Sequence, residues 1–119
     1  MKKLFLTALV FGGLFASDIP ANVDKVLKNN GCMSCHNVFG PNKAPAFAGV
    51  ARKNIRWYGD NAKNTIINSI KKGSSGKYRR YNAAMPPYSN LSQKELEDVA
   101  DWILSLKFNQ RGKGWRMKN

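Results

Sequence analysis

Two cysteines and a histidine lie close together in the first third of the chain. Cys32 and Cys35 are separated by two residues, and His36 follows directly. They are the only cysteines and the only histidine among the 119 residues. The spacing C-x-x-C-H is the attachment pattern of a c-type heme, in which both thiols bond to the porphyrin and the histidine ligates the iron. The pattern therefore predicts one covalent heme c held by Cys32, Cys35 and His36.

Other uses of the same three residues agree less well with the sequence. A disulfide between Cys32 and Cys35 would close a very small loop, which adds little stability to a whole domain. A thioredoxin-like dithiol would need a β-α-β context, which the sequence does not indicate. A structural zinc site needs four nitrogen or sulfur ligands, whereas cysteine and histidine together supply three. Heme attachment is therefore favoured over a redox dithiol, a zinc site or a chance match.

A second axial ligand for the iron has to be a methionine or a lysine, because the chain has no other histidine. Met33 lies inside the attachment loop and cannot reach the other face, and Met117 lies near the end of the chain. Met85 is followed by Pro86 and Pro87, which fix the backbone immediately beyond it. We therefore predict Met85 as the distal ligand, with simple packing into a gap of the core as the alternative.

Residues 1–16 have the features of an export signal. Lys2 and Lys3 form a basic start, residues 4–15 form an apolar stretch, and Ala16 offers a small residue for cleavage. The apolar stretch is shorter than the roughly 20 residues that a membrane-spanning helix needs. The alternative is an ordinary buried first helix. We expect a cleaved signal peptide and a periplasmic protein.

The charge of the chain is strongly basic and unevenly distributed. The formal net charge is +13, and from Lys25 through Lys94 there are thirteen lysines and arginines with Asp60 as the only acid. Such a field attracts an acidic partner, a polyanion or an anionic membrane surface. Nucleic-acid binding would rest on the charge alone, and the export signal and the heme motif argue against it. We expect acidic redox proteins as partners, and no nucleic acid.

Hydrophobic periodicity predicts a small all-α domain. Helices are expected over residues 22–30, 61–72 and 92–107, with a short fourth helix over residues 47–53. Ser92 and Glu95 form a capping box at the start of the last helix. The loops over residues 37–46 and 73–90 are rich in Gly, Pro, Asn and Ser, and the second contains Met85. Helices this short make a thin core, so a prosthetic group is expected to fill the middle.

Over residues 23–107 the chain resembles the small bacterial class I cytochromes c, the single-heme, His/Met-ligated proteins of the periplasm. The motifs that carry the resemblance are KNNG at 28–31, CMSCH at 32–36, APAF at 44–47, VARK at 50–53, IKKGSSG at 70–76, MPP at 85–87 and DWILSLK at 101–107. The resemblance implies a cytochrome c fold, in which three to four short helices wrap around one covalently bound heme.

The resemblance also assigns roles to residues outside the attachment motif. It implies that the carbonyl of Pro45 accepts a hydrogen bond from the ring of His36, which would orient that ligand. Tyr78 matches a position where the family often has a tryptophan near a heme propionate, and its hydroxyl could do the same work. Trp102 of the last helix would pack across Leu27 of the first. The implied organisation is a signal peptide over 1–16, a cytochrome c domain over 17–107 and a basic tail over 108–119.

Two segments depart from the family pattern. Residues 79–84 bring Arg79 and Arg80 close to the methionine loop, where the family often has Gly and Pro. Residues 108–119 extend beyond the usual end and carry four basic residues around Trp115. We interpret this tail as a partner-docking arm, a contact with a membrane surface, or a disordered solubilising segment.

A heme with both axial positions filled has no open site for a substrate, so the sequence predicts an electron carrier and not an enzyme. Two other roles stay open at this point: a cytochrome subunit of a periplasmic oxidoreductase, for example a sulfur-oxidising one, and a ligand sensor with a five-coordinate iron. We expect a monomer. The expected docking patch around the heme edge comprises Lys43, Lys77, Arg79 and Arg80.

Overall fold

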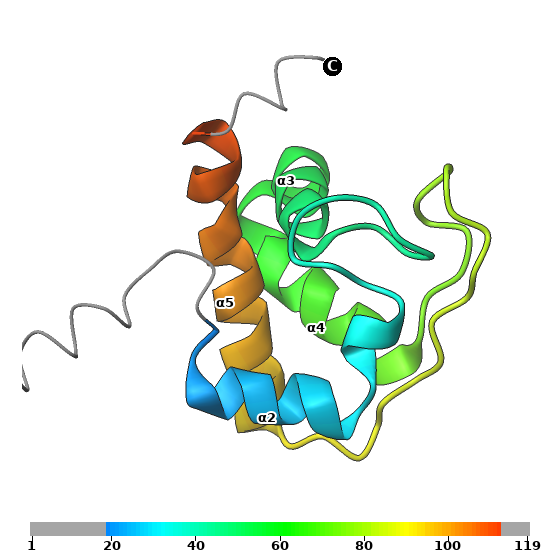
Figure 1. Cartoon of the computed structure of the whole chain (residues 1–119), viewed down its shortest axis with the longest axis vertical. Helices are drawn as coiled ribbons and strands as arrows, with labels where there is room; N and C mark the ends of the chain where they lie inside the picture. Colours follow the sequence, from blue (N-terminus) through cyan, green and yellow to red (C-terminus); the bar gives the residue numbers. More distant parts are fainter. Residues whose placement is uncertain (1–18, 113–119) are drawn as a thin grey trace, which may run out of the picture.

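The part of the chain that the structure describes contains four α-helices and two short 3-10 helices, joined by loops (Figure 1). The structure is a computed structural model, and it describes the backbone of residues 19–112 and the side chains of residues 19–106. The elements are α2 (Ala21–Asn29), η1 (Cys32–Ser34), α3 (Phe47–Tyr58), η2 (Gly59–Asn61), α4 (Ala62–Lys72) and α5 (Gln93–Gly112). Within the described residues the only β-type pairing is an isolated bridge between Ser74 and Met85. The predicted all-α class is confirmed.

Helix α5 is the element around which the others assemble. It packs against α2, α3 and α4, and Figure 1 shows α2 crossing it near one end while α3 and α4 lie along its side. The helices contact one another through the apolar stripes that the sequence predicted. Leu27, Leu96 and Ala100, which belong to these stripes, are almost fully buried. Trp102 and Leu27 belong to the same buried cluster, as expected.

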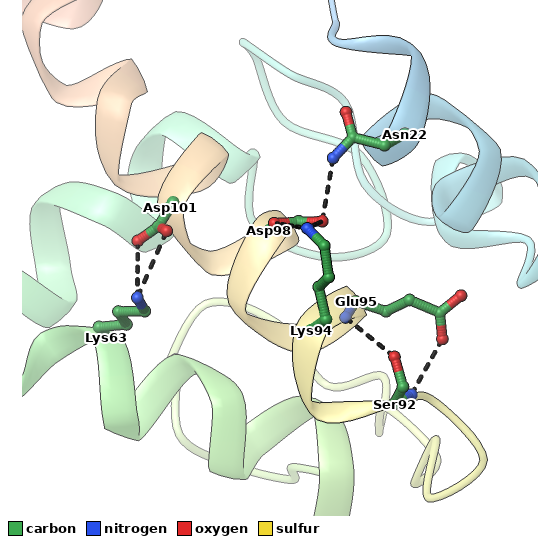
Figure 2. A network of polar contacts seen from close by, with 7 residues as sticks. All are labelled: Asn22, Lys63, Ser92, Lys94, Glu95, Asp98 and Asp101. Atoms are coloured by element: carbon green, nitrogen blue, oxygen red, sulfur yellow. Dashed lines mark hydrogen bonds and ion pairs between the residues drawn. The ribbon is translucent and has the colours of Figure 1, made fainter.

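Polar contacts fix the start of α5 and its neighbours (Figure 2). The Glu95 backbone N–H donates to Ser92 Oγ at 3.1 Å, and the Ser92 N–H donates to Glu95 Oε1 at 2.9 Å, which is the predicted capping box. Lys63 of α4 pairs with Asp101 of α5 at 3.1 Å. Such exposed pairs contribute little energy each.

Two helix ends differ from the prediction. Helix α3 runs to Tyr58, five residues beyond the expected end at residue 53, and α5 continues to Gly112 instead of ending at residue 107. Helix α3 continues until Gly59, whose φ of +56° suits glycine and ends the helix. Its buried face continues from Phe47 and Ala51 to Asn54, a polar residue that interrupts the apolar pattern in the sequence. The expected signal peptide and residues 113–119 of the tail lie outside the described residues. Among the helices that the structure does describe, none has the length and apolar character needed to cross a membrane.

Candidate heme site

One cavity of about 300 Å³ is lined by all six residues that the sequence analysis assigned to a heme site. They reach it from different parts of the chain: the attachment motif after α2, the loop before α3, and the long loop after α4. The six residues are Cys32, Cys35, His36, Pro45, Tyr78 and Met85. The rest of the wall is mainly aliphatic and includes Val26, Leu27, Ile66, Ile70, Val99 and Ile103. The folded chain thus brings the expected donors together at a largely apolar hollow.

The attachment motif is held by a single turn of backbone. The N–H groups of Cys35 and His36 both donate to the Cys32 carbonyl oxygen, at 3.3 and 3.0 Å. This turn is the 3-10 helix η1, and it places both thiols and the imidazole on the cavity. No disulfide joins the two cysteines. Burial raises the pKa of the Cys32 thiol, more than its backbone hydrogen bond lowers it.

The ring of His36 is fixed on two sides. Its Nδ1 lies 2.6 Å from the carbonyl oxygen of Pro45. A carbonyl oxygen can only accept, so Nδ1 carries the proton and donates, and Nε2 keeps a free lone pair. The ring also stacks on Phe47, with centroids 4.7 Å apart, and Phe47 meets Trp102 edge-on. Burial lowers the pKa of His36, against the opposing effect of the Pro45 bond, so the neutral ring that metals bind is favoured.

The loop that carries Met85 is tied to the end of α4. Ser74 and Met85 exchange two backbone hydrogen bonds, at 3.0 and 2.8 Å, and the Tyr88 N–H donates to the Ile70 carbonyl at 2.8 Å. Gly73 makes this close approach feasible, because its φ is +87° and a Cβ there would lie 2.9 Å from the Met85 carbonyl oxygen. The position of Met85 in the cavity is therefore set by backbone pairing as well as by the two prolines.

A buried asparagine that the sequence analysis did not single out organises the polar part of the wall. Asn54 is only 1% exposed, and its amide nitrogen donates to the Val50 carbonyl and to the Tyr78 hydroxyl, both at 2.8 Å. Its Oδ1 lies 3.0 Å from Thr65 Oγ1 and 3.5 Å from Lys77 Nζ. The signal was visible in the sequence, since position 54 lies three and seven residues after two buried positions of the same helix.

Tyr78 and Lys77 are the polar groups that this asparagine holds at the cavity. Because the Tyr78 oxygen accepts from Asn54, its own O–H is free to donate elsewhere. Burial raises the pKa of Tyr78, whereas the hydrogen bond from Asn54 lowers it. Lys77 Nζ also lies 3.3 Å from Ser69 Oγ, and burial lowers its pKa. Lys77 is therefore partly enclosed, unlike Lys43, Arg79 and Arg80 of the expected docking patch, which are exposed.

The donor set agrees with a covalently bound iron porphyrin. Such a group needs two thiols one turn apart, a nitrogen ligand with a free lone pair, apolar walls, and polar donors for its carboxylates. Each of these is present in the cavity. Within residues 19–106 no group of three or more His, Cys, Asp and Glu side chains is arranged to hold a metal ion directly.

Comparison with known proteins agrees with this chemistry. The family model described as cytochrome c matches residues 21–107. The chain belongs to the cytochrome c family. Cytochrome c-552 of Hydrogenobacter thermophilus is 36% identical over 109 residues, which cover 90% of this chain and all of that protein. Cytochrome c-552 of Nitrosomonas europaea is 37% identical over 108 residues, which cover 90% of this chain and all of that protein.

Solved structures agree with the fold. The crystal structure of wild-type Nitrosomonas europaea cytochrome c552 matches with a TM-score of 0.61 and 35% identity, over 74% of this chain and all of that chain. The predicted family and cytochrome c fold are confirmed. The chain is accordingly a small c-type cytochrome that carries heme c and transfers electrons, and it is not an enzyme. The individual roles of the six site residues stay predictions.

Proposed function

We propose that this cytochrome c is an exported, periplasmic one-electron carrier whose iron is ligated by His36 and Met85. The observation that carries the proposal is the 2.6 Å hydrogen bond from His36 Nδ1 to the Pro45 carbonyl. It leaves Nε2 as the one free ring nitrogen of a side chain that lines the cavity. Met85 lines the same cavity and offers a thioether sulfur as the second ligand.

Heme c supplies the reversible gain and loss of one electron at its iron. The chain keeps both ligands in one place while this happens. Phe47 and Pro45 hold the imidazole, and the backbone bridge from Ser74 holds the methionine. If His36 and Met85 both bound the iron, no coordination position would be left for a substrate. A thioether ligand would also raise the reduction potential.

The polar side of the cavity is suited to the carboxylates of the heme. Tyr78 has a hydroxyl hydrogen free to donate, and Lys77 brings an ammonium group, both held by Asn54. Charge-assisted hydrogen bonds of this kind are shorter and stronger than neutral ones. We therefore assign Tyr78 and Lys77 to the carboxylate groups and Cys32 and Cys35 to the thioether bonds.

The partners of this carrier would be acidic redox proteins in the periplasm. From Lys25 through Lys94 the chain has thirteen basic residues and one acidic residue. This positive charge favours encounters with acidic partners and makes their rate sensitive to salt. An export signal over residues 1–16 would deliver the chain to that compartment, where the heme is attached. A monomer with a small docking area suits rapid, transient exchange.

Absorption spectra of the heme-loaded protein and its Met85→Ala variant test the ligand assignment. We expect a low-spin wild-type spectrum with a weak sulfur-to-iron band in the oxidised state. The band should disappear in the variant, and the midpoint potential should fall because the thioether is lost.

The matched control is Met33→Ala, which removes a methionine that is 39% exposed within the attachment loop. This variant should keep the sulfur-to-iron band and the potential. A high-spin wild-type spectrum, or one that Met85→Ala does not change, would contradict Met85 ligation and favour a ligand-binding role for the heme.

A further inference from the structure

The last turns of α3 expose two neighbouring aromatic side chains. Trp57 and Tyr58 are each 42% exposed, and among the described side chains the only other exposed large hydrophobic residue is Met33, at 39%. The two rings contact each other, with centroids 6.2 Å apart and an angle of 81° between their planes. Tryptophan and tyrosine at a protein surface are the residue types most enriched at the centres of protein interfaces.

Basic side chains border the aromatic pair. Lys53 and Arg56 are exposed and lie four and one residues before Trp57, so Lys53 and Trp57 share one face of the helix. Lys53 Nζ lies 5.7 Å from the centroid of the Trp57 ring, and Lys77 Nζ lies 5.2 Å from that of Tyr58. Asp60, which follows the pair in η2, is the only acid from Lys25 through Lys94, so basic side chains outnumber acidic ones around the pair.

The aromatic pair also connects to the heme cavity. The Trp57 ring lies 5.5 Å from the ring of Tyr78, centroid to centroid, and Tyr78 lines the cavity. A molecule seated on Trp57 is therefore separated from the cavity by one further aromatic side chain. The same contacts hold Trp57 in place before any partner arrives, which lowers the entropy cost of binding.

We propose that Lys53, Arg56, Trp57 and Tyr58 form a docking surface for an acidic redox protein. We call these four residues the α3 surface. The proposal rests on the proposed function, since it names where a partner of the electron carrier binds. Carboxylates of the partner would face Lys53 and Arg56, and an apolar side chain would cover Trp57. One electron leaves the partner's redox centre as one reaches the heme iron, and no bond or proton is exchanged.

Charge complementarity and the shape of the α3 surface favour a protein over a lipid membrane. The two rings are more than half covered and are held by neighbouring side chains. Helices that bind a membrane surface bury a long apolar face in the headgroup region, which two partly covered rings do not offer. A rigid aromatic centre with a charged border matches the small interfaces of transient redox complexes.

The test is the rate at which a reduced, acidic plant-type ferredoxin transfers an electron to the oxidised, heme-loaded cytochrome at low salt. We expect Lys53→Glu/Arg56→Glu to lower the second-order rate constant at least tenfold. The matched control, Lys25→Glu/Lys72→Glu, changes the net charge equally on α2 and at the far end of α4, and should lower it less than about threefold. Trp57→Ala should slow transfer severalfold while keeping the dependence on salt, because it removes contact and not charge.

Two further measurements separate the docking surface from the proposed function. Adding oxidised ferredoxin to the oxidised cytochrome should shift the indole N–H resonance of Trp57, without electron transfer. Reduction by ascorbate, a small anion, measured at high salt so that protein charge is screened, should be equal in the wild type and in both charge-reversal variants. If ascorbate could not reduce the wild type, or if the reduced protein could not be oxidised again, both proposals would be overturned.

Normal reduction by ascorbate together with equal slowing of ferredoxin transfer in both double variants would overturn the α3 surface alone. It would mean that net charge steers the encounter without a specific site. Two other results would also overturn the proposal if the ferredoxin rate stayed unchanged. One is loss of binding to phosphatidylglycerol vesicles in Lys53→Glu/Arg56→Glu, which would indicate a membrane contact. The other is loss of self-association in that variant, which would indicate a second copy as the occupant.

Discussion

Asn54 is a buried polar residue on an otherwise apolar helix face, and its contacts explain why it is tolerated there. Its side chain is 1% exposed, yet its amide nitrogen has two acceptors and its oxygen lies within reach of two donors. Buried polar groups are expensive only when they lack partners. The same contacts orient the Tyr78 hydroxyl. One residue thereby links helix packing to the polar wall of the heme cavity.

Replacing Asn54 with leucine should weaken both the fold and the orientation of Tyr78. The variant keeps similar volume but leaves the partly buried Tyr78 oxygen without its donor, which costs about 1–3 kcal/mol of unfolding free energy. The hydrogen bond from Asn54 lowers the pKa of Tyr78, so its loss should raise that pKa further above its ordinary value of 10. Denaturant unfolding measures the first effect, and NMR titration of ¹³C-labelled tyrosine measures the second.

The control for this prediction is Asn64→Leu, because Asn64 makes only an exposed hydrogen bond to Asn61 among the described side chains. Its unfolding free energy should change by no more than about 0.5 kcal/mol, with no change in the pKa of Tyr78. An unchanged Tyr78 titration in Asn54→Leu would contradict the positioning role.

In the wild type, the raised pKa of Tyr78 means that its contribution to stability is complete below pH 10 and is lost as the pH rises through the folded pKa.

At the scale of single residues, the sequence predicted what has a strong local pattern. The attachment motif and Met85 were assigned to one site because cysteine, histidine and methionine are rare here and their spacing is specific, and the structure brings them to one cavity; their roles as ligands stay predictions. Asn54 was missed because it lies one residue beyond the expected end of the helix at residue 53 and a polar residue is not expected on a buried face, although its spacing from Phe47 and Ala51 matches that face. Its partners Tyr78 and Lys77 lie 24 and 23 residues away, and only the folded chain brings them together.

At the scale of elements, helices with a clear apolar period were predicted close to their observed bounds. Helix α4 begins one residue after the expected start and ends at Lys72 as expected. The ladder-like pairing of Ser74 with Met85 was not predicted, because two isolated residues within a long loop have no strand pattern. This pairing depends on three-dimensional closure of residues 73–90, which the sequence indicates only through its glycines and prolines.

Gly73→Ala should displace the methionine loop. A Cβ at this position would lie 2.9 Å from the Met85 carbonyl oxygen and 3.1 Å from the Pro87 nitrogen. Both are backbone atoms, so the loop that carries the ligand must move. We expect a weakened sulfur-to-iron absorption band and a shifted Met85 methyl resonance in the reduced protein, together with lower stability.

Gly76→Ala provides a matched control in the same loop. Gly76 also has a positive φ, +73°, but a Cβ there would meet no atom within 4 Å. Both variants carry the strain of a side chain at positive φ, roughly 1–2 kcal/mol, and only Gly73→Ala adds the clash. Equal spectra in the two variants would show that the contact between Gly73 and the Met85 loop does not position the ligand.

At the scale of the whole molecule, the helices share one buried apolar cluster and also border the cavity. Helices α2, α4 and α5 contribute the aliphatic side chains of the cavity wall. The family resemblance, which rests on motifs over residues 23–107, agrees in extent with the family match over residues 21–107. The sequence predicted the thin core from helix length alone. It did not predict the α3 surface, because Trp57 lay beyond the expected end of that helix and its contact with Tyr78 is formed only in the folded chain.

We expect folding to depend on the heme. Without it, the mainly apolar wall of this cavity, about 300 Å³ in volume, would be exposed to water, and the loss of buried apolar surface would remove part of the small free energy that stabilises such a domain. The double variant Cys32→Ala/Cys35→Ala has no thiol for attachment, and we expect it to lose most of its helical circular dichroism and its cooperative thermal transition. Met33→Ala, which changes the same segment without removing a thiol, should keep both. If the double variant retained native helicity and unfolded cooperatively without heme, the contacts among α2, α3, α4 and α5 would suffice for folding, and the cavity would be a binding site in a self-sufficient fold.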